Sequence, residues 1–322
     1  MKDKMKGNLM LLTTAIIWGT AFVAQKEGMD LIGPIAFNGI RTVIGGIILL
    51  PVIWFMSKMN SSKAEPDDRS PEEIAAAKKA ENKLLVIGGI VCGLALMFAG
   101  NVQQIGLFYT TAGKAAFITP FYVMLVPLIG LIFLRKKIRL VVWGCVIAAI
   151  AGLYLLCIPA EGGLGGVNKG DAIMLICSLG FALHILAVDY FSPKVDGVKL
   201  SCIQFFVAGI VSIILIFPLD PALGFDIPTW ENILGSWFPL CYVGIMSCGV
   251  AYTFQVTGQA YTDPTSASMI LSLESVFGVI AGMIFLGEVM AVREVIGCVI
   301  MFAAIIIAQL PSKEERLAAK AD

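Results

Sequence analysis

The sequence has little charge and almost no histidine. Charged residues make up 14% of its 322 residues, whereas soluble domains typically contain about 25%. The formal net charge is zero, which argues against nucleic acid as a partner. The one histidine, His184, is too few for a His-based metal cluster. We therefore expect no nucleic-acid partner and no bound metal.

The sequence also lacks the motifs of common enzymes and of ATP-driven pumps. It contains no G-x-x-x-x-G-K-[ST], H-E-x-x-H or G-x-S-x-G stretch. Its eight cysteines form no C-x-x-C pair and lie in or beside apolar segments, so we expect them to fill the core. We expect no cofactor and no enzymatic activity, and an integral-membrane enzyme is the less favoured alternative.

Long apolar runs are abundant. Hydrophobic residues make up 58% of the chain and occur in runs of about 20, long enough to cross the bilayer as helices. The sequence therefore predicts an all-α membrane protein with ten transmembrane helices. The predicted spans are 7–25, 34–57, 84–108, 113–134, 138–159, 170–191, 199–219, 236–258, 265–286 and 291–310.

The positive charges predict the orientation of these spans. If the N-terminus is inside, 18 of the 23 Lys and Arg residues fall in inner segments and four at outer ends. This bias predicts that both termini are cytoplasmic, and we expect a cell (plasma or inner) membrane. The longest loop, 58–83, is then cytosolic. Within it, Ser70-Pro71-Glu72-Glu73 predicts the start of a short solvated helix that ends near Lys83.

The two halves of the chain resemble each other. Gly144-Cys145-Val146-Ile147 recurs at Gly297-Cys298-Val299-Ile300. We predict two five-helix repeats, residues 1–160 and 161–322; because five is odd, the second must be inverted. Inverted repeats are typical of secondary transporters, whose substrate sites lie near the membrane midplane. A shift of 152 residues superimposes further identical residues: Gln103 on Gln255, Gly106 on Gly258, and Tyr109-Thr110 on Tyr261-Thr262.

Several short stretches resemble those of a known family. They are Trp18-Gly19-Thr20-Ala21-Phe22, Arg41, residues 111–119, Leu273-Glu274-Ser275-Val276-Phe277 and Leu286-Gly287-Glu288. Through them, nearly the whole chain resembles the drug/metabolite transporter superfamily, in particular EamA-type permeases. The resemblance implies a ten-helix carrier that moves small metabolites, often amino acids, out of the cell. The family often has proline where this chain has Ser275, which predicts a straighter ninth helix.

Glu274 is the strongest candidate for a functional charge inside the membrane. A charge at the bilayer centre costs roughly 2.5–3.5 kcal/mol on insertion scales, so it usually faces a cavity or a partner. Glu274 lies about nine residues, or roughly 13 Å, into its predicted span, and its repeat counterpart is Tyr122. We predict that Glu274 binds a substrate ammonium group or a coupling proton. The alternative is a structural hydrogen bond to a neighbouring helix.

Two basic residues are further candidates. Arg41 lies about 10 Å from the outer surface and is predicted to pair with a substrate carboxylate or with Glu274. It could instead snorkel outward and do neither. Lys114 opens a helix at the outer edge, where it is either an interface anchor or a substrate contact.

Polar residues on two other helices extend the predicted site. Tyr252, Gln255 and Gln259 fall on one face of the eighth helix, and Gln103 repeats part of this stripe in the third. Interhelical hydrogen bonding is the alternative reading of the stripe. His184 is a second candidate for proton coupling, because its ordinary pKa lies near neutral pH.

Aromatic residues complete the predicted site. Trp18 aligns with Phe181 in the repeat, and such a pair could clamp a ligand between the halves or simply pack in the core. The predicted substrate-binding residues are Trp18, Arg41, Gln103, Lys114, Tyr122, Phe181, Tyr252, Gln255, Gln259 and Glu274.

Together these patterns predict a secondary active transporter that exports small metabolites such as amino acids by alternating access of its two repeats. The alternative within the same class is a multidrug or organic-cation efflux carrier. The expected partners are a small-molecule substrate, the lipid bilayer and a coupling proton. The protein is expected to be a monomer or a homodimer.

Overall fold

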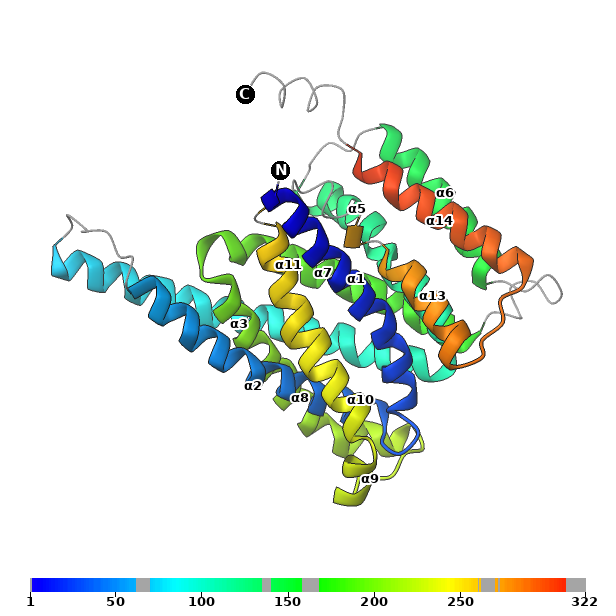
Figure 1. Ribbon diagram of the computed structural model, residues 1–322, viewed down its shortest axis with the longest axis horizontal. Helices are drawn as coiled ribbons and strands as arrows, with labels where there is room; N and C mark the ends of the chain where they lie inside the picture. The colour runs from blue at the N-terminus through cyan, green and yellow to red at the C-terminus, as the bar shows by residue number, and fades with distance from the viewer. Residues whose placement is uncertain are drawn as a thin grey trace.

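In the computed structural model the chain forms a bundle of helices (Figure 1). The structure describes residues 2–61, 70–134, 140–157, 168–259, 261, 270–271 and 273–310. The first half comprises α1 (Lys2–Glu27), α2 (Pro34–Ser61), α3 (Pro71–Tyr109), α4 (Ala112–Ile118), η1 (Thr119–Phe121), α5 (Tyr122–Leu134) and α6 (Leu140–Cys157). The second half comprises α7 (Lys169–Phe191), η3 (Ser192–Lys194), α8 (Gly197–Ala222), α9 (Trp230–Gly235), α10 (Trp237–Cys241), η4 (Tyr242–Ala251), α11 (Tyr252–Gln259), α13 (Glu274–Phe285) and α14 (Val292–Gln309).

The helices confirm the predicted all-α membrane fold. Within the described ranges, seven helices are long and apolar enough to cross a membrane, and Ala112–Val126 and Glu274–Phe285 form shorter apolar helices. Helices suit this environment because lipid offers no partners for backbone N–H and C=O groups, which must bond to each other. The helices follow the predicted spans in order along the chain, and the count of ten membrane crossings stays a prediction.

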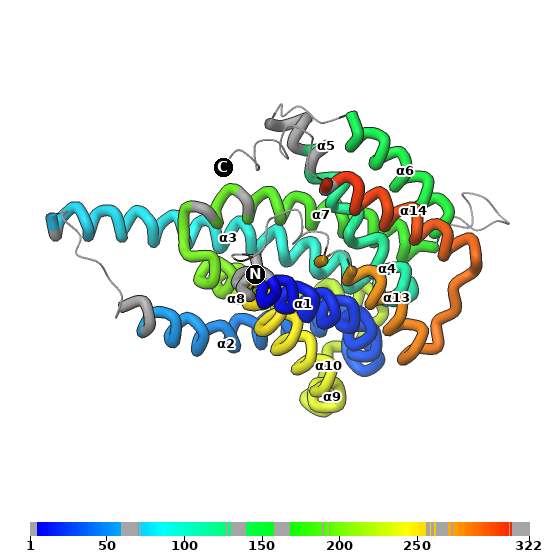
Figure 2. The backbone as a smooth tube through the Cα atoms, turned by 45° about the horizontal axis from the view of Figure 1, so that its top comes forward, coloured from blue at the N-terminus to red at the C-terminus, as the bar shows by residue number. Residues whose placement is uncertain are grey.

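One predicted loop helix is part of a longer helix. As predicted, Ser70 caps α3: its hydroxyl accepts a hydrogen bond from the Glu73 amide at 3.3 Å, and its own amide donates to Glu73 Oε2 at 2.9 Å. However, α3 then continues without a break for 39 residues to Tyr109. The predicted end near Lys83 is therefore wrong. The end of α2 and the start of α3 project from the rest of the bundle (Figures 1 and 2).

Three of the predicted spans are not continuous α-helices. The fourth has a 3₁₀ turn, η1, around Pro120, a residue that cannot donate a backbone hydrogen bond. The eighth contains a π-helix, η4, a rare geometry that often occurs at functional sites. In the ninth, Leu273 lies in a turn and α13 begins at Glu274. Residues 262–269 and 272 lie outside the described residues, so the straighter helix expected from Ser275 stays a prediction.

The helices pack as two units and one edge pair, and α2 packs on η4 between the two units. In the first unit, here called the α3 unit, α3 packs on α7 and α8, and α8 packs on α2. In the second, the α1 unit, α1 packs on α13, η4 and α11, and α13 packs on α4. The pair α6 and α14 lies along one edge of the bundle (Figures 1 and 2).

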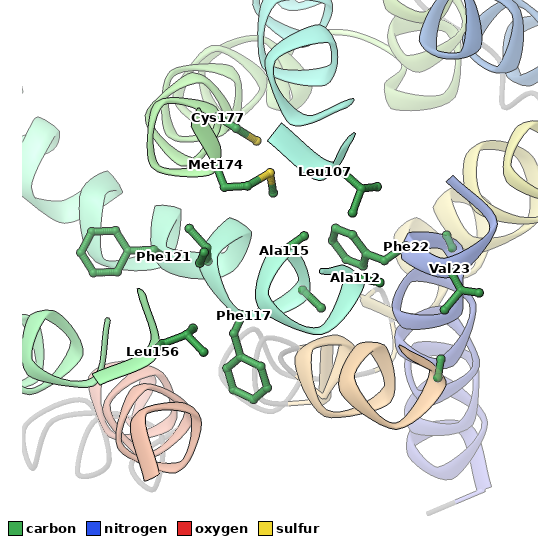
Figure 3. Close-up of a cluster of buried hydrophobic side chains, with 14 of the residues drawn as sticks. Phe22, Val23, Leu107, Ala112, Ala115, Phe117, Phe121, Leu156, Met174 and Cys177 are labelled. Atoms are coloured by element: carbon green, nitrogen blue, oxygen red, sulfur yellow. The ribbon is translucent and has the colours of Figure 1, made fainter. Parts of the chain in front are cut away.

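Helix α4 lies within the largest cluster of buried hydrophobic side chains. Ala115 is fully buried and Phe117 is 4% exposed, and Figure 3 shows α4 between Phe22 of α1, Met174 of α7 and Leu156 of α6. The small side chains of α4 let these helices approach one another, as is common where membrane helices pack.

Three glycines allow pairs of helices to pack closely. A Cβ atom on Gly89 would lie 2.3 Å from Ile203 Cγ2, and one on Gly93 would lie 2.6 Å from Val207 Cβ. A Cβ atom on Gly278 would lie 2.3 Å from Ala116 Cβ. These distances are too short for any side chain, so the glycines allow α3 to approach α8 and α13 to approach α4.

Two glycines of α6 provide a matched test of this close packing. At Gly152 a Cβ atom would lie 2.7 Å from Met301 Cγ and 2.8 Å from the Gly297 oxygen of α14, whereas at Gly144 it would meet nothing within 4 Å. Gly152→Ala is therefore expected to destabilise the protein by about 1–3 kcal/mol through overpacking. Gly144→Ala should be neutral or slightly stabilising, because alanine favours helix. Thermal unfolding in detergent measures both, and equal effects would contradict the close crossing of α6 and α14.

Candidate functional site

A cavity of ≈ 700 Å³ lies among helices of both halves of the chain. Its wall combines one carboxylate, one guanidinium, several amides and a group of aromatic rings. Nine of the eleven side chains predicted from the sequence line it: Trp18, Arg41, Gln103, Tyr122, Phe181, His184, Tyr252, Gln255 and Glu274.

Glu274 is the carboxylate of this cavity. It is the first residue of α13, where a negative charge interacts favourably with the positive end of the helix dipole. The preceding residue, Leu273, provides no side-chain cap. Glu274 is 9% exposed, and this small exposed area faces the cavity. The carboxylate is therefore placed to meet a positively charged group or a proton that enters the cavity.

Arg41 is the guanidinium of the cavity, and it comes from α2. It is 9% exposed, so it does not snorkel to the bilayer surface. Its Nε and Nη2 atoms donate to the side-chain oxygen of Asn38, at 3.1 and 2.9 Å. Among the residues that the structure describes, no ion pair joins Arg41 to Glu274. The cavity thus contains one group of each charge, held apart.

The aromatic residues form two pairs rather than one clamp. Trp18 contacts Tyr252 edge-on, with ring centroids 5.6 Å apart, and Phe181 lies 6.4 Å from Tyr122. The Trp18 indole N–H donates to the Ser247 carbonyl of η4 at 3.2 Å, which fixes the orientation of its ring. Each residue of the predicted Trp18 and Phe181 pair therefore contacts a tyrosine and presents an apolar surface to the cavity.

The amide groups of the wall are partly paired with each other. Gln103 Nε2 donates to the Thr119 hydroxyl at 3.4 Å. His184 Nε2 lies 2.9 Å from Gln204 Oε1, a partner in α8 that the sequence analysis did not single out. Gln255 also lines the cavity. These side chains offer both donors and acceptors to a polar solute.

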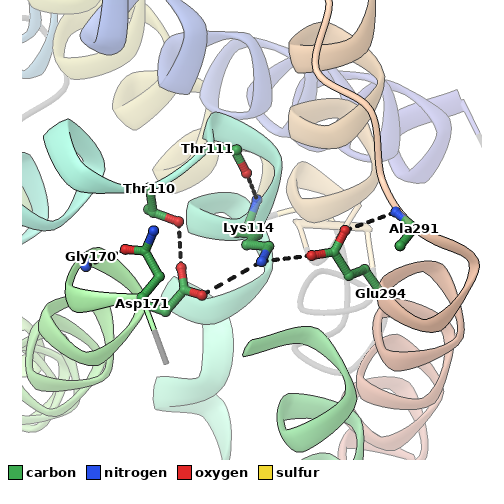
Figure 4. Close-up of polar contacts among 8 residues, drawn as sticks. Thr110, Thr111, Lys114, Gly170, Asp171, Ala291 and Glu294 are labelled. Carbon is green, nitrogen blue, oxygen red and sulfur yellow. Dashed lines mark hydrogen bonds and ion pairs between the residues drawn. The ribbon is translucent and has the colours of Figure 1, made fainter. Parts of the chain in front are cut away.

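Two predicted site residues are not placed in the cavity. Lys114 lies outside the wall and forms ion pairs with Glu294 at 2.7 Å and with Asp171 at 3.7 Å (Figure 4). The Thr110 hydroxyl donates to the same Asp171 carboxylate. Gln259 belongs to α11, but its side chain lies outside the part that the structure describes. Lys114 therefore joins α4 to α7 and α14 at one end of the bundle.

This end, which we call the carboxylate end, carries four acidic side chains that the sequence analysis did not connect. Asp220 accepts hydrogen bonds from the amides of Ile35 and Ala36, which begin α2, both at 3.0 Å. Glu288 accepts from the amides of Ala112 and Gly113, which begin α4, at 2.6 and 2.9 Å. A carboxylate at a helix N-terminus satisfies amides that have no partner within the helix. The four residues are Asp171, Asp220, Glu288 and Glu294.

A lysine also links helices at the carboxylate end. Lys26 of α1 donates to the main-chain oxygen of Leu107 at 3.2 Å and to that of Thr110. Leu107 is in the last turn of α3 and Thr110 is its C-cap, and a positive charge at this end interacts favourably with the helix dipole. Lys26 and Lys114 thus connect the α1 unit to the α3 unit at this end.

The cavity reaches the opposite end of the bundle. Its wall includes Ser192 of η3, and Gly197 and Ser201 at the start of α8. Toward the carboxylate end, its wall goes no further than Gln25 and Asn38, while the lysine contacts lie beyond them. Among the described residues, no group of His, Cys, Asp or Glu is arranged to hold a metal ion.

Known proteins resemble this chain over nearly its whole length. The model of the EamA-like transporter family matches residues 5–158 and 168–309. An uncharacterized transporter of Archaeoglobus fulgidus is 28% identical, over 95% of this chain and 87% of that protein. A WAT1-related chloroplastic protein of Arabidopsis thaliana is 24% identical, over 94% of this chain and 69% of that protein. A solved crystal structure with 15% sequence identity has the same fold, with a TM-score of 0.58 over 97% of this chain and 98% of that chain.

Proposed function

The chain belongs to the EamA-like transporter family, and from this premise we propose that it is a secondary active carrier that exports small metabolites such as amino acids. That it is a multi-pass membrane protein and a transporter of the drug/metabolite type follows from its family and its apolar helices. Its solute, its direction of transport and its mechanism belong to the proposal.

The observation that carries the proposal is the cavity between the two halves. Its wall includes Arg41 and Gln103 from the first half and His184 and Glu274 from the second. Secondary transporters built from repeats bind their substrates in such a place. The cavity extends to one end of the bundle, and the Lys26 and Lys114 contacts close the other. This arrangement suits one state of an alternating-access cycle.

The packing of the helices supports two inverted repeats, residues 1–160 and 161–322. If the halves correspond, α1 is equivalent to α7, and α3 to the series α10, η4 and α11. The packing of α3 on α7 is then equivalent to that of α1 on η4 and α11. In the pairs α2–α8 and α6–α14, each helix packs on its own repeat counterpart. A pseudo-two-fold axis in the membrane plane would produce this pattern.

The proposed orientation places the carboxylate end outside the cell. The excess of Lys and Arg in the inner segments supports cytoplasmic termini in the cell membrane. The start of α8, which the cavity reaches, is then cytosolic. A cavity accessible from the cytosol and closed outside is the state in which an exporter takes up its solute.

Glu274 and the aromatic residues also support a second candidate, an organic-cation efflux carrier. Trp18, Tyr122 and Tyr252 surround the same cavity as Glu274, and aromatic faces attract organic cations. Arg41 opposes this candidate because it is a positive charge in the same wall. We therefore place it second.

Counterflow in reconstituted vesicles tests the carrier proposal. Vesicles preloaded with unlabelled solute are expected to accumulate the same labelled solute transiently, because a carrier exchanges solute across the membrane without net flux. The solutes to compare are the twenty protein amino acids and a set of organic cations. If no solute shows counterflow, the carrier proposal is overturned; conversion of a solute to a product would instead favour a membrane enzyme.

A further inference from the structure

We infer that Asn101, acting through Asn38, positions Arg41 as a charged anchor in the cavity, so that the transported solute must carry a carboxylate. This inference rests on the proposed function and specifies the substrate class of the same cavity. It depends on a chain of side-chain hydrogen bonds that joins three helices of the α3 unit behind the cavity wall.

The chain of hydrogen bonds begins at the guanidinium. Asn38 Oδ1 accepts from both Nε and Nη2 of Arg41. Asn38 Nδ2 donates to Asn101 Oδ1 of α3 at 2.7 Å, and the Ser212 hydroxyl of α8 donates to the same oxygen at 3.1 Å. Asn38, Asn101 and Ser212 are at most 5% exposed. A buried network of this kind restricts the side chains that it joins.

The donors and acceptors fix the orientation of each amide. Arg41 can only donate, so Asn38 must present its oxygen to Arg41 and its nitrogen to Asn101. Asn101 must then present its oxygen, and its buried Nδ2 atom is left without a hydrogen-bond partner. An unsatisfied buried donor is costly. The unsatisfied donor is therefore at Asn101, behind the cavity wall, and Asn38 Oδ1 remains the acceptor for Arg41.

Arg41 consequently retains its positive charge and some of its donors. Asn38 is a neutral acceptor and occupies the Nε–Nη2 edge of the guanidinium. Nη1 takes part in no hydrogen bond among the described contacts. Burying a guanidinium without a counter-ion is energetically costly, and an anion that pairs with it offsets this cost. Because Arg41 lines the cavity, that anion can be supplied by the solute. A planar carboxylate matches the fork of a guanidinium.

The substrate class follows from the two charges together. Glu274 meets a positive group and Arg41 a negative one, in a cavity whose described wall contains no other Asp, Glu, Lys or Arg side chain. A zwitterion that carries an ammonium and a carboxylate group satisfies both, whereas an organic cation leaves Arg41 uncompensated. The carboxylate should therefore contribute to affinity through Arg41, and this contribution should depend on Asn38 and Asn101.

Binding to the purified protein tests the inference separately from transport. The probes are the twenty protein amino acids, each compared with the amine that lacks its carboxylate, and binding is measured by thermal stabilisation. At least one amino acid is expected to bind, with its amine at least about tenfold weaker. The inference is overturned if no amino acid binds or if an amine binds as tightly as its parent. Absence of counterflow would instead overturn the carrier, because the binding assay needs no flux.

Two variants test the role of the network. Asn38→Asp keeps the acceptor for Arg41 but neutralises its charge, so the amino acid should lose about tenfold or more in affinity while its amine does not. Asn101→Leu removes the acceptor for Asn38 and should also reduce the ratio of the affinity for the amino acid to the affinity for its amine. Gln104→Leu is the matched control, because Gln104 is a buried amide on α3 that bonds to the Gln25 oxygen and does not line the cavity. If Asn101→Leu fails to fold, Asn38→Asp alone decides, and an unchanged ratio in Asn38→Asp overturns the inference.

Discussion

Glu274→Gln is expected to lose most gradient-driven transport while the variant still inserts and folds. Glutamine keeps the size and hydrogen-bonding capacity of glutamate but cannot take a proton or form an ion pair. Glu274 lines the cavity at the start of α13. Hydrogen bonds to charged groups contribute about 1.5–3 kcal/mol, so the loss corresponds to roughly 10–100-fold. Transport driven by a proton gradient in reconstituted vesicles measures it.

Exchange measurements separate the two roles proposed for Glu274. If the residue binds only a coupling proton, solute exchange across the membrane should survive in Glu274→Gln while driven transport is lost. If it binds the substrate ammonium, exchange and driven transport should fall together. Glu231→Gln is the matched control, because Glu231 is also in the first turn of a helix but lies on the exposed α9. Driven transport at the wild-type rate in Glu274→Gln would leave Glu274 a structural residue.

Much of the cavity could be predicted because membrane burial makes polar residues informative. Few residues inside the apolar spans are charged or strongly polar, and each needs a partner or a cavity. Glu274, Arg41, Gln103 and Gln255 were recognisable for this reason, and all four line the cavity. Helical spacing alone also places Asn38 one turn before Arg41, so this contact could have been found from the sequence.

The remaining features depend on contacts between segments distant in the sequence. Nothing in the local sequence of Lys114 shows that Asp171 and Glu294 lie beside it. The same holds for Asn101 and Ser212, which α3 and α8 bring to Asn38. The turn at Leu273 was missed because no proline or glycine stands within two residues of it in the sequence. The local sequence around each of these residues does not contain this three-dimensional information.

The closed carboxylate end gives the second large prediction. Under alternating access, the contacts of Lys26 with the end of α3 and of Lys114 with Asp171 must break when this end opens. They connect the α1 unit to the α3 unit, whereas the caps made by Asp220 and Glu288 join helices within one unit, α8 with α2 and the end of α13 with α4. The lysine contacts should therefore stabilise the closed state specifically, while the caps should stabilise both states.

Lys26→Met combined with Lys114→Met is expected to shift the protein toward opening at the carboxylate end. Each lysine contributes contacts worth about 1.5–3 kcal/mol, and about 1.4 kcal/mol corresponds to a tenfold change in an equilibrium. The Asp171 side chain is fully buried, but it lies at the carboxylate end and can be hydrated when this end opens. A cysteine at Gln25 should therefore react at least about tenfold faster with a membrane-impermeant maleimide supplied on the carboxylate side.

The control is Lys169→Met in the same Gln25→Cys background. Lys169 lies at the same end, at the start of α7, but its ammonium group lies over the Tyr109 ring, 4.3 Å from the centroid. This contact joins α7 to α3, two helices of one unit, so its loss should not change the labelling rate. The native cysteines add little background, since seven of the eight are buried. A shift of the equilibrium must change the accessibility of the cavity from the carboxylate side. If the double lysine variant is labelled at the rate of the control, these lysine contacts therefore do not hold the carboxylate end closed.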